Sequence, residues 1–343
     1  MRKLYKALIA IPAIAVLGLV GYYTATEPVT DENYSLAFSD LIAKDIADKG
    51  GDNKFYHHRT LVPLDDQPVP TINRDTMYSY AAIDATSDFT ITIPELDGRY
   101  ASLQVLNQGH FDAGVYLGAG THTIQASNTT DWVAVNVRIQ VDGTDPADIA
   151  YVNTLQDKLQ LDFFDVPRKP FETANWNMLQ FIQKHKYWIA EANERGVLNT
   201  FAKVGEIDDD HRNRGTAIAT GLLPADQAIY IGRTYEVNLS QCYVATYDVP
   251  DMRDELGFYS ITMYGDDNYL HTEEFNNVNS QNMTLNADGK TFDVYYGSAV
   301  ACGDVDNRLQ TPTETIFPYF RVYLPSEELQ EHGFEMPELK LVK

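Results

Sequence analysis

The segment from residue 71 to residue 79, Thr-Ile-Asn-Arg-Asp-Thr-Met-Tyr-Ser, combines polar, charged and aromatic residues between stretches that predict β-strands. Neighbouring side chains of a strand point to opposite faces, so at least one of Arg74 and Asp75 must face the interior or a second domain. A buried guanidinium needs a carboxylate or several hydrogen-bond acceptors, because leaving it unpaired is costly. The chemistry of this segment is therefore either ion pairing or the binding of a polar ligand.

Two interpretations of Arg74 are open at this point. In the first, Arg74 forms an ion pair with Asp97 or Asp84 that sets the register of the sheet. In the second, Asn73, Arg74 and Tyr78 line a cleft that binds an anionic or sugar-like ligand, because their side chains offer hydrogen bonds to such molecules.

The chain also offers carboxylates for acid–base catalysis. Glycosidic bonds are cleaved by pairs of carboxyl groups about 5–10 Å apart, and Asp75, Asp97 and Asp112 are candidates for the acid and the base. No pair stands out among the many acidic residues. The sequence contains no nucleophile elbow, P-loop, zinc-protease helix, EF-hand loop or dinucleotide fingerprint. The catalytic residues of such an enzyme are therefore unknown.

The eight histidines do not indicate a metal site. His57 and His58 are adjacent, so on a strand they would point to opposite faces and make a poor pair of ligands. A metal bound by one of them with His110 and Asp112 is the alternative to surface or hydrogen-bonded histidines. We predict no metal and no cofactor.

Residues 4–22 form an apolar stretch that is preceded by basic residues. As a helix of about 1.5 Å per residue, the stretch would reach about 30 Å, the thickness of a bilayer core. Because the positive end stays in the cytoplasm, everything after Glu27 is predicted to be exported.

The end of this stretch favours an uncleaved anchor over a cleaved signal peptide. Tyr22 and Tyr23 are bulky where a signal peptidase needs small residues, and residues 24–26 are the one alternative cleavage region. We expect the protein on the periplasmic side of the inner membrane, anchored by residues 4–22. If the signal is cleaved, the protein would be periplasmic or secreted.

The charge balance excludes some classes of partner. The chain has 26 basic and 49 acidic residues, a net charge of −23. Such a body repels nucleic acid and anionic membrane surfaces, so we expect no nucleic-acid partner. With 44% hydrophobic and 12% aromatic residues, the composition is typical of a folded globular protein.

Cys242 and Cys302 are the only two cysteines, and export would place them in an oxidising compartment. A disulfide between them would close a loop of about 60 residues and stabilise the fold by roughly 3–4.5 kcal/mol. Two separate buried thiols are the alternative, because the sequence does not show how far apart the two Cα atoms lie.

Hydrophobic periodicity predicts strands on either side of a helical middle. One helix is expected over residues 31–49, a second over residues 175–193, and a weaker one over residues 216–221. The alternation of Val133, Val135 and Val137 with Asn136 and Arg138 is typical of a half-buried antiparallel strand. Further predicted features are strands over residues 235–239, 259–263, 292–296 and 320–324 and a turn over residues 286–289.

These patterns predict an α+β fold that is predominantly β, with two antiparallel β-sandwich-like domains joined by a helical connector. The predicted organisation is residues 1–28 as a signal anchor or signal peptide, 31–145 as an N-terminal β-rich domain, 146–229 as a helical connector and 230–343 as a C-terminal β-sandwich domain.

Two motifs resemble known bacterial families. Residues 73–79, with Asp97-Gly98-Arg99-Tyr100 downstream, resemble domain of unknown function 1254. Residues 258–264, 286–289 and 318–325 resemble domain of unknown function 1214, its usual companion. That family often has tryptophan where this chain has Tyr259.

The resemblance implies a largely β architecture with a jelly-roll-like C-terminal half, export and self-association into a homo-oligomer. It supplies no reaction. Residues of these two motifs make up the candidate ligand-binding set, which is Asn73, Arg74, Asp75, Tyr78, Tyr259 and Arg321.

Two functions are open from the sequence. The favoured one is a non-catalytic envelope protein that binds a small molecule or another envelope protein in a groove between its two β domains. The alternative is an extracytoplasmic, hydrolase-like enzyme that acts on carbohydrate or another polar substrate through paired carboxylates.

Overall fold

A computed structural model describes residues 26–67, 70–196 and 202–342. The described residues are predominantly β and form several antiparallel sheets, as the periodicity predicts. None of the helices in the described ranges is long and apolar enough to cross a membrane. Residues 4–22, where the sequence predicts an anchor, lie outside the described residues.

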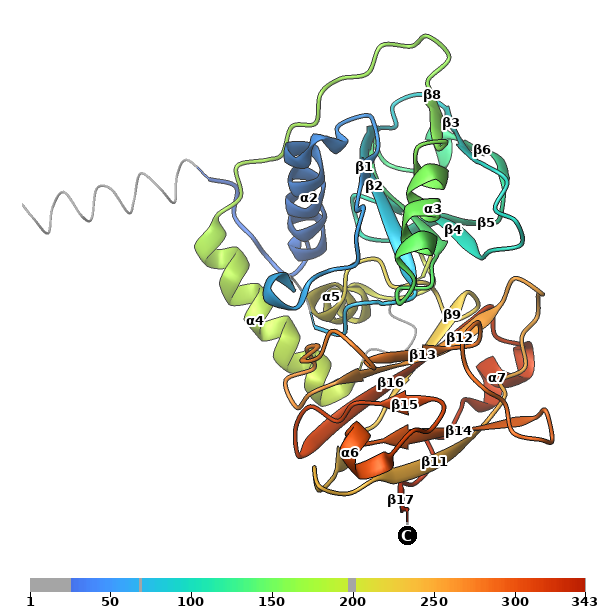
Figure 1. The fold of residues 1–343 in the computed structure, drawn as a ribbon. Helices are drawn as coiled ribbons and strands as arrows, with labels where there is room; N and C mark the ends of the chain where they lie inside the picture. Colours follow the sequence, from blue (N-terminus) through green and yellow to red (C-terminus); the bar gives the residue numbers. More distant parts are fainter. Residues whose placement is uncertain (1–25, 68–69, 197–201, 343) are drawn as a thin grey trace, which may run out of the picture.

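Two antiparallel sheets make up the N-terminal part, drawn in blue to green in Figure 1. The larger sheet has the strand order β1 (Tyr56–His57), β2 (Thr76–Asp84), β7 (Trp132–Gln140), β4 (Ala101–Asn107) and β5 (Asp112–Leu117). The smaller sheet has the order β6 (Gly120–Ile124), β3 (Phe89–Ile93) and β8 (Gln160–Asp162).

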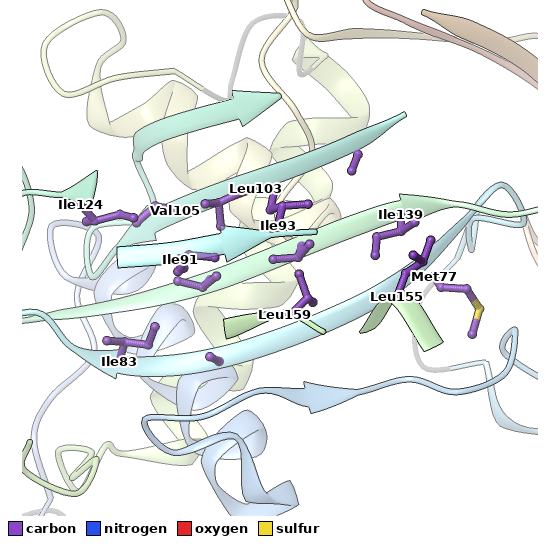
Figure 2. Close-up of a cluster of buried hydrophobic side chains, with 14 of the residues drawn as sticks. Met77, Ile83, Ile91, Ile93, Leu103, Val105, Ile124, Ile139, Leu155 and Leu159 are labelled. Atoms are coloured by element: carbon purple, nitrogen blue, oxygen red, sulfur yellow. The ribbon is translucent and has the colours of Figure 1, made fainter. Parts of the chain in front are cut away.

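The N-terminal hydrophobic core lies between these sheets and helix α3 (Pro146–Gln156) (Figure 2). The alternating residues of β7, among them Val135 and Val137, point into this core as predicted. Helix α3 begins at a proline after Asp145, whose side chain accepts a hydrogen bond from the Ala147 N–H and so caps the helix. Because Val152 and Leu155 of α3 join the core, this helix is part of the N-terminal packing.

Three helices gather on the opposite side of the larger sheet: α2 (Tyr34–Ile46), α4 (Met178–Arg195) and α5 (Asp209–Ile218). Helix α2 contacts β2 and β7, and α4 and α5 pack against α2. The first two predicted helices are confirmed. The third helix begins at Asp209 rather than at residue 216, because the side chain of Asp208 caps it by accepting a hydrogen bond from the His211 N–H.

The C-terminal part is formed by two sheets that enclose a second hydrophobic core. One sheet has the order β10 (Tyr235–Glu236), β16 (Thr315–Tyr323), β12 (Phe258–Tyr264) and β13 (Asn277–Asn279), with β9 (Ala228–Gly232) also paired to β16. The other has the order β15 (Arg308–Leu309), β14 (Thr291–Tyr296), β11 (Tyr243–Asp248) and β17 (Lys340–Leu341), with β14 and β15 parallel. The remaining short helices are α6 (Ala299–Cys302), α7 (Glu327–His332), η1 (Ala47–Gly51), η2 (Leu64–Asp66) and η3 (Ala126–Asn128).

The predicted strand over residues 235–239 is shorter than expected, since β10 ends at Glu236. The side chain of Asn238 accepts hydrogen bonds from the N–H and the hydroxyl of Ser240, and this local turn ends the strand. The predicted turn over residues 286–289 is present: Gly289 has a φ of +65°, and the Asn286 N–H donates to the Thr291 carbonyl at 2.8 Å.

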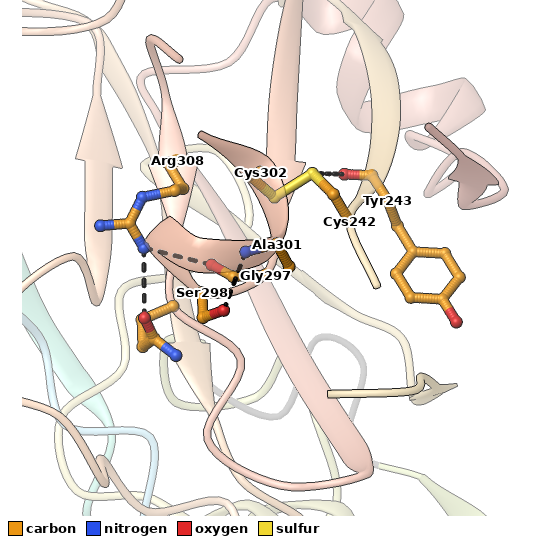
Figure 3. The surroundings of a disulfide bond; sticks show 8 residues. Cys242, Tyr243, Gly297, Ser298, Ala301, Cys302 and Arg308 are labelled. Carbon is orange, nitrogen blue, oxygen red and sulfur yellow. Dashed lines mark hydrogen bonds between the residues drawn. A yellow bond between two sulfur atoms is a disulfide. The ribbon is translucent and has the colours of Figure 1, made fainter. Parts of the chain in front are cut away.

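Cys242 and Cys302 are joined by a disulfide, with their Cα atoms 4.9 Å apart (Figure 3). Cys242 directly precedes β11, and Cys302 is the last residue of α6. The bond therefore holds the short helix α6 against the sheet that contains β11. Of the two alternatives that the sequence leaves open, the structure shows the disulfide rather than two separate thiols.

Candidate functional site

Asp75 is buried where the N-terminal part meets the C-terminal part. Its carboxylate accepts a hydrogen bond from the Ser260 hydroxyl of β12 at 2.5 Å and one from the Asn277 amide of β13 at 2.9 Å. Burial raises the pKa of Asp75, and the positive charge of Arg321 opposes the shift. Both oxygens of this carboxylate thus have protein partners.

Arg321, also buried, lies on β16 near this carboxylate. Its guanidinium donates to the Thr262 hydroxyl at 2.9 Å, to the Thr71 carbonyl at 2.7 Å and to the Tyr264 hydroxyl at 2.9 Å. The ring of Tyr319 lies 4.8 Å from the guanidinium carbon. Arg321 therefore ties the C-terminal sheet to the segment that precedes β2.

Asn73 completes this connection. Its amide donates to the Tyr323 hydroxyl at 2.7 Å, and its side-chain oxygen accepts from the Asp75 N–H at 2.6 Å. We call Asn73, Asp75, Arg321, Ser260 and Asn277 the interdomain clamp. Its hydrogen bonds indicate a structural role, which is to hold the two parts in a fixed relation.

Arg74 points away from the clamp. Its guanidinium donates to the Val62 carbonyl at 2.9 Å and lies 4.0 Å from the Glu273 carboxylate. The prediction that Arg74 forms an ion pair with Asp97 or Asp84 is wrong, because the chain before β2 turns Arg74 toward the loops around residues 62 and 273 instead.

Tyr78 and Tyr259 lie apart, on two different sheets. Tyr78 of β2 stacks on Tyr80 with the ring centres 5.7 Å apart, and Arg138 of β7 lies over its ring. Tyr259 of β12 faces the C-terminal core, where its ring contacts Phe292. The structure thus brings Asn73, Asp75 and Arg321 together, while Arg74, Tyr78 and Tyr259 each have other surroundings.

The three carboxylates considered for catalysis have separate surroundings. Asp75 belongs to the clamp, Asp97 accepts a hydrogen bond from the Tyr151 hydroxyl at the surface, and Asp112 accepts one from the Gln104 amide at 2.6 Å. Among the residues that the structure describes, no group of three or more His, Cys, Asp or Glu side chains is placed to hold a metal ion.

A second polar cluster, which the sequence reasoning missed, lies on the larger N-terminal sheet. We call it the polar sheet face, and its members are Ser102, Gln104, Asp112, Asn136 and Arg138, all buried. Ser102 pairs with Arg138 and Gln104 with Asn136 across β4 and β7. These side chains point away from the hydrophobic core. The prediction that β7 is half-buried is nevertheless wrong, because helices and the segment around residue 221 cover this second face as well.

Hydrogen bonds connect part of the polar sheet face to that covering segment. Arg138 donates to the side-chain oxygen of Gln104 at 3.0 Å and to the Gly221 carbonyl. The Gln104 amide donates to Asp112 and, at 2.9 Å, to the Leu222 carbonyl. The segment around residue 221 therefore closes over this face in a defined position.

Four buried polar atoms of this face have no hydrogen-bond partner among the described residues: Ser102 Oγ, Asp112 Oδ2, Asn136 Oδ1 and Arg138 Nη1. Buried groups of this kind are rare in folded proteins, because each unsatisfied donor or acceptor costs about 1–3 kcal/mol. The four atoms lie on β5, β4 and β7, which are neighbouring strands, so this sheet face has hydrogen-bonding capacity that the described residues do not use.

The carboxyl group of Asp112 also has unusual acid–base behaviour. Burial raises the pKa of Asp112 to about 7, although the hydrogen bond from Gln104 and the charge of Arg138 oppose the shift. A group with a pKa near neutrality can donate or accept a hydrogen bond under physiological conditions, and such groups cluster at functional sites.

A small cavity lies next to this face, between α2 and the ends of β4 and β7. Its volume is about 20 Å³, enough for a single water molecule. Asp40 and His110 contribute polar atoms to its lining, and His110 Nδ1 lies 2.9 Å from the Ser39 hydroxyl.

A stretch of the N-terminal part matches a known family model. Residues 53–123 match the sequence model of a family described as protein of unknown function (DUF1254). The match spans β1 to β6 and includes Ser102, Gln104 and Asp112 of the polar sheet face. The resemblance of the C-terminal part to domain of unknown function 1214 stays a prediction.

Two crystal structures share the fold. The VPA0106 protein from Vibrio parahaemolyticus is 18% identical, with a TM-score of 0.66 over 91% of this chain and 99% of that chain. An uncharacterised protein from Burkholderia cenocepacia is 14% identical, with a TM-score of 0.50 over 91% of this chain and 87% of that chain. At these identities the likeness shows the fold alone. No curated protein matches the sequence.

Proposed function

We propose that this protein is an exported, membrane-anchored envelope protein that binds a small polar ligand between its two β-rich parts. The observation that supports the site is the set of unpartnered buried atoms Asp112 Oδ2, Asn136 Oδ1 and Arg138 Nη1. The apolar residues 4–22 support the anchor, and the disulfide between Cys242 and Cys302 supports an extracytoplasmic location.

The chemistry of the unpartnered atoms defines the ligand. Arg138 Nη1 can donate a hydrogen bond to a carbonyl, carboxylate or hydroxyl oxygen. Asn136 Oδ1 and ionised Asp112 accept hydrogen bonds from hydroxyl or amino groups. The ligand is therefore a small molecule that carries both acceptor and donor groups, such as a polyol or a zwitterion.

The interdomain clamp supports this site indirectly. In this proposal the C-terminal part is a jelly-roll-like sandwich. The clamp holds this sandwich against the N-terminal sheet. The Leu223 N–H donates to the Tyr230 hydroxyl of β9 at 3.3 Å, so the segment that covers Arg138 is also tied to the C-terminal part. A fixed relation between the two parts keeps the ligand site closed to solvent.

Native mass spectrometry of the protein, purified in detergent from the membrane fraction of an expression host, tests this function. We expect an added mass on the wild-type chain that is absent from the Asp112→Asn and Arg138→Met variants. Asp84→Asn is the matched control, because Asp84 is a buried carboxylate of the same sheet whose two oxygens are already hydrogen-bonded to Thr86 and Lys169.

The control variant should keep the added mass. A folded wild-type protein that carries no added mass, and whose melting temperature does not change in a screen of polyols, sugars and amino acids, would contradict ligand binding at this face. Loss of the added mass in all three variants would assign the ligand to a different site.

A further inference from the structure

Helix α4 has an exposed apolar surface at its beginning. Met178, Leu179 and Ile182 are 39%, 47% and 46% exposed, and their spacing places them on one side of the first two turns. The side of α4 next to these residues packs on α2: the Tyr34 hydroxyl lies 2.7 Å from His185 Nδ1, and Trp188 is buried. Figure 1 shows α4 at the outer edge of the molecule. We call Met178, Leu179 and Ile182 the α4 apolar patch.

The chain enters the described part of the protein beside this patch. The Glu27 N–H donates to the Asn175 carbonyl, and the Asn177 N–H donates to the Glu27 carbonyl, both at 2.8 Å. Asn177 is the residue that caps α4. Residue 27 is therefore fixed at the start of the helix that carries the patch.

The proposed anchor ends close to this point. Tyr22, the last residue of the apolar stretch, and Glu27 are five positions apart along the chain. Even a fully extended chain of that length spans at most about 18 Å. A bilayer crossed by residues 4–22 therefore has its surface within that distance of residue 27, and the α4 apolar patch lies within its reach.

The charge of this helix also differs from that of the rest of the chain. The protein carries a net charge of −23, but residues 175–190 contain no acidic residue. The same stretch contains Lys184, which pairs with Asp31 at 2.8 Å, and the exposed Lys186 one turn after Ile182. The first turns of α4 thus combine exposed apolar residues with a lysine and no acidic residue, and such a stretch suits a membrane surface that the rest of the body would repel.

We propose that α4 lies on the outer surface of the membrane in which residues 4–22 are anchored, with the α4 apolar patch inserted among the lipid headgroups. This inference rests on the proposed anchoring. A second copy of the chain fits the patch less well, because stable protein interfaces use about 20–30 residues on each side and the patch has three apolar side chains. Contact through α4 sets the orientation of the whole body on the membrane.

Photolabelling of the full-length chain tests this arrangement. The protein is reconstituted in vesicles of phosphatidylethanolamine and phosphatidylglycerol that contain a phospholipid with a diazirine in its acyl chain. After irradiation, lipid adducts are located by peptide mass spectrometry. We expect several-fold more adducts on the peptide that contains Met178, Leu179 and Ile182 than on the peptide with Val300, which is 98% exposed in the C-terminal part.

A double variant, Leu179→Ser with Ile182→Ser, should lower the labelling of α4 to the level of the Val300 peptide, while Val300→Ser should leave α4 labelling unchanged. Labelling of residues 4–22 without labelling of α4 would overturn this inference but would leave the proposed anchoring intact. The same result is expected if a second copy of the chain or the N-terminal residues cover the patch, and it would overturn the inference in that case too. The absence of adducts from residues 4–22 would instead overturn the proposed anchoring.

Discussion

At the scale of single residues, two buried carboxylates of this protein have opposite surroundings. Asp75 receives hydrogen bonds on both oxygens and lies near the charge of Arg321. Asp112 receives a hydrogen bond on one oxygen from Gln104, and its Oδ2 has no partner among the described residues. Both oxygens of the first carboxylate are thus hydrogen-bonded within the fold, whereas one oxygen of the second is the basis of the proposed ligand site.

We predict that Asp112 makes the stability of the protein depend on pH. Its pKa is about 7 in the folded state and 3.8 as the ordinary value. Between these values the folded state holds a proton that the unfolded state has lost. The free energy of unfolding should therefore fall with rising pH, by up to about 1.4 kcal/mol per pH unit, from about pH 4 to about pH 7.

Urea unfolding at a series of pH values between 4 and 8 checks this prediction. Asp112→Asn should remove the decline and leave the variant more stable than the wild type at pH 8. Hydrogen bonds from Thr86 and Lys169 outweigh the effect of burial and lower the pKa of Asp84, so the Asp84→Asn control should keep the decline. Identical pH profiles for the wild type and Asp112→Asn would show that Asp112 is ionised throughout this range.

At the scale of elements, β16 and the irregular segment before β2 are coupled through the side chains of Arg321 and Tyr323. Arg321 of β16 reaches the Thr71 carbonyl, while Tyr264 of β12 donates to the Ile72 carbonyl at 2.6 Å. Thr71 has a φ of +51°, an unusual value for a residue other than glycine, and its N–H donates to the Asn268 carbonyl. The segment thus follows the C-terminal sheet rather than continuing β2.

We predict that Arg321→Met lowers the free energy of unfolding by about 3–5 kcal/mol, because it leaves the buried Asp75 without its positive neighbour. Chemical denaturation measures the loss. In the double variant with Asp75→Asn the two losses should not add, because both substitutions remove the same interaction. Arg253→Met, at an exposed arginine of the C-terminal part, should change the stability by less than about 0.5 kcal/mol. Additive losses would contradict the clamp.

At the scale of the whole molecule, the two β-rich parts have separate hydrophobic cores. Their boundary combines the polar clamp with a smaller apolar cluster, in which the ring of Tyr100 contacts Phe258 and Tyr323. The disulfide lies on the far side of the C-terminal core from this boundary (Figures 1 and 3). It joins residues that are 60 positions apart in the sequence. It therefore contributes to the stability of the C-terminal sandwich without touching the proposed ligand site.

We predict that removing the disulfide, in a variant with Cys242→Ser and Cys302→Ser, lowers the free energy of unfolding by about 4 kcal/mol, because the unfolded chain gains the entropy of an open loop. Denaturant unfolding with and without dithiothreitol measures this effect. The reductant should destabilise the wild type and leave the variant unchanged. Equal stability of the wild type and the variant would mean that the bond adds nothing to the fold.

The sequence by itself determined the local features of this protein. Alternation of Val133, Val135 and Val137 predicted a strand with one apolar face, and helical spacing predicted α2 and α4. These features depend on residues that are close in the sequence, and backbone geometry turns their spacing directly into a buried face.

Only the tertiary structure decided what lies against the other faces. The sequence placed Asn136 and Arg138 opposite the valines, but it could not show that α2 and the segment around residue 221 cover them. It singled out Asn73, Asp75 and Arg321, yet their partners Ser260, Asn277 and Thr71 belong to segments up to 250 residues away. Whether a polar side chain is solvated, paired or left open to a ligand depends on such long-range contacts, and local spacing does not encode them.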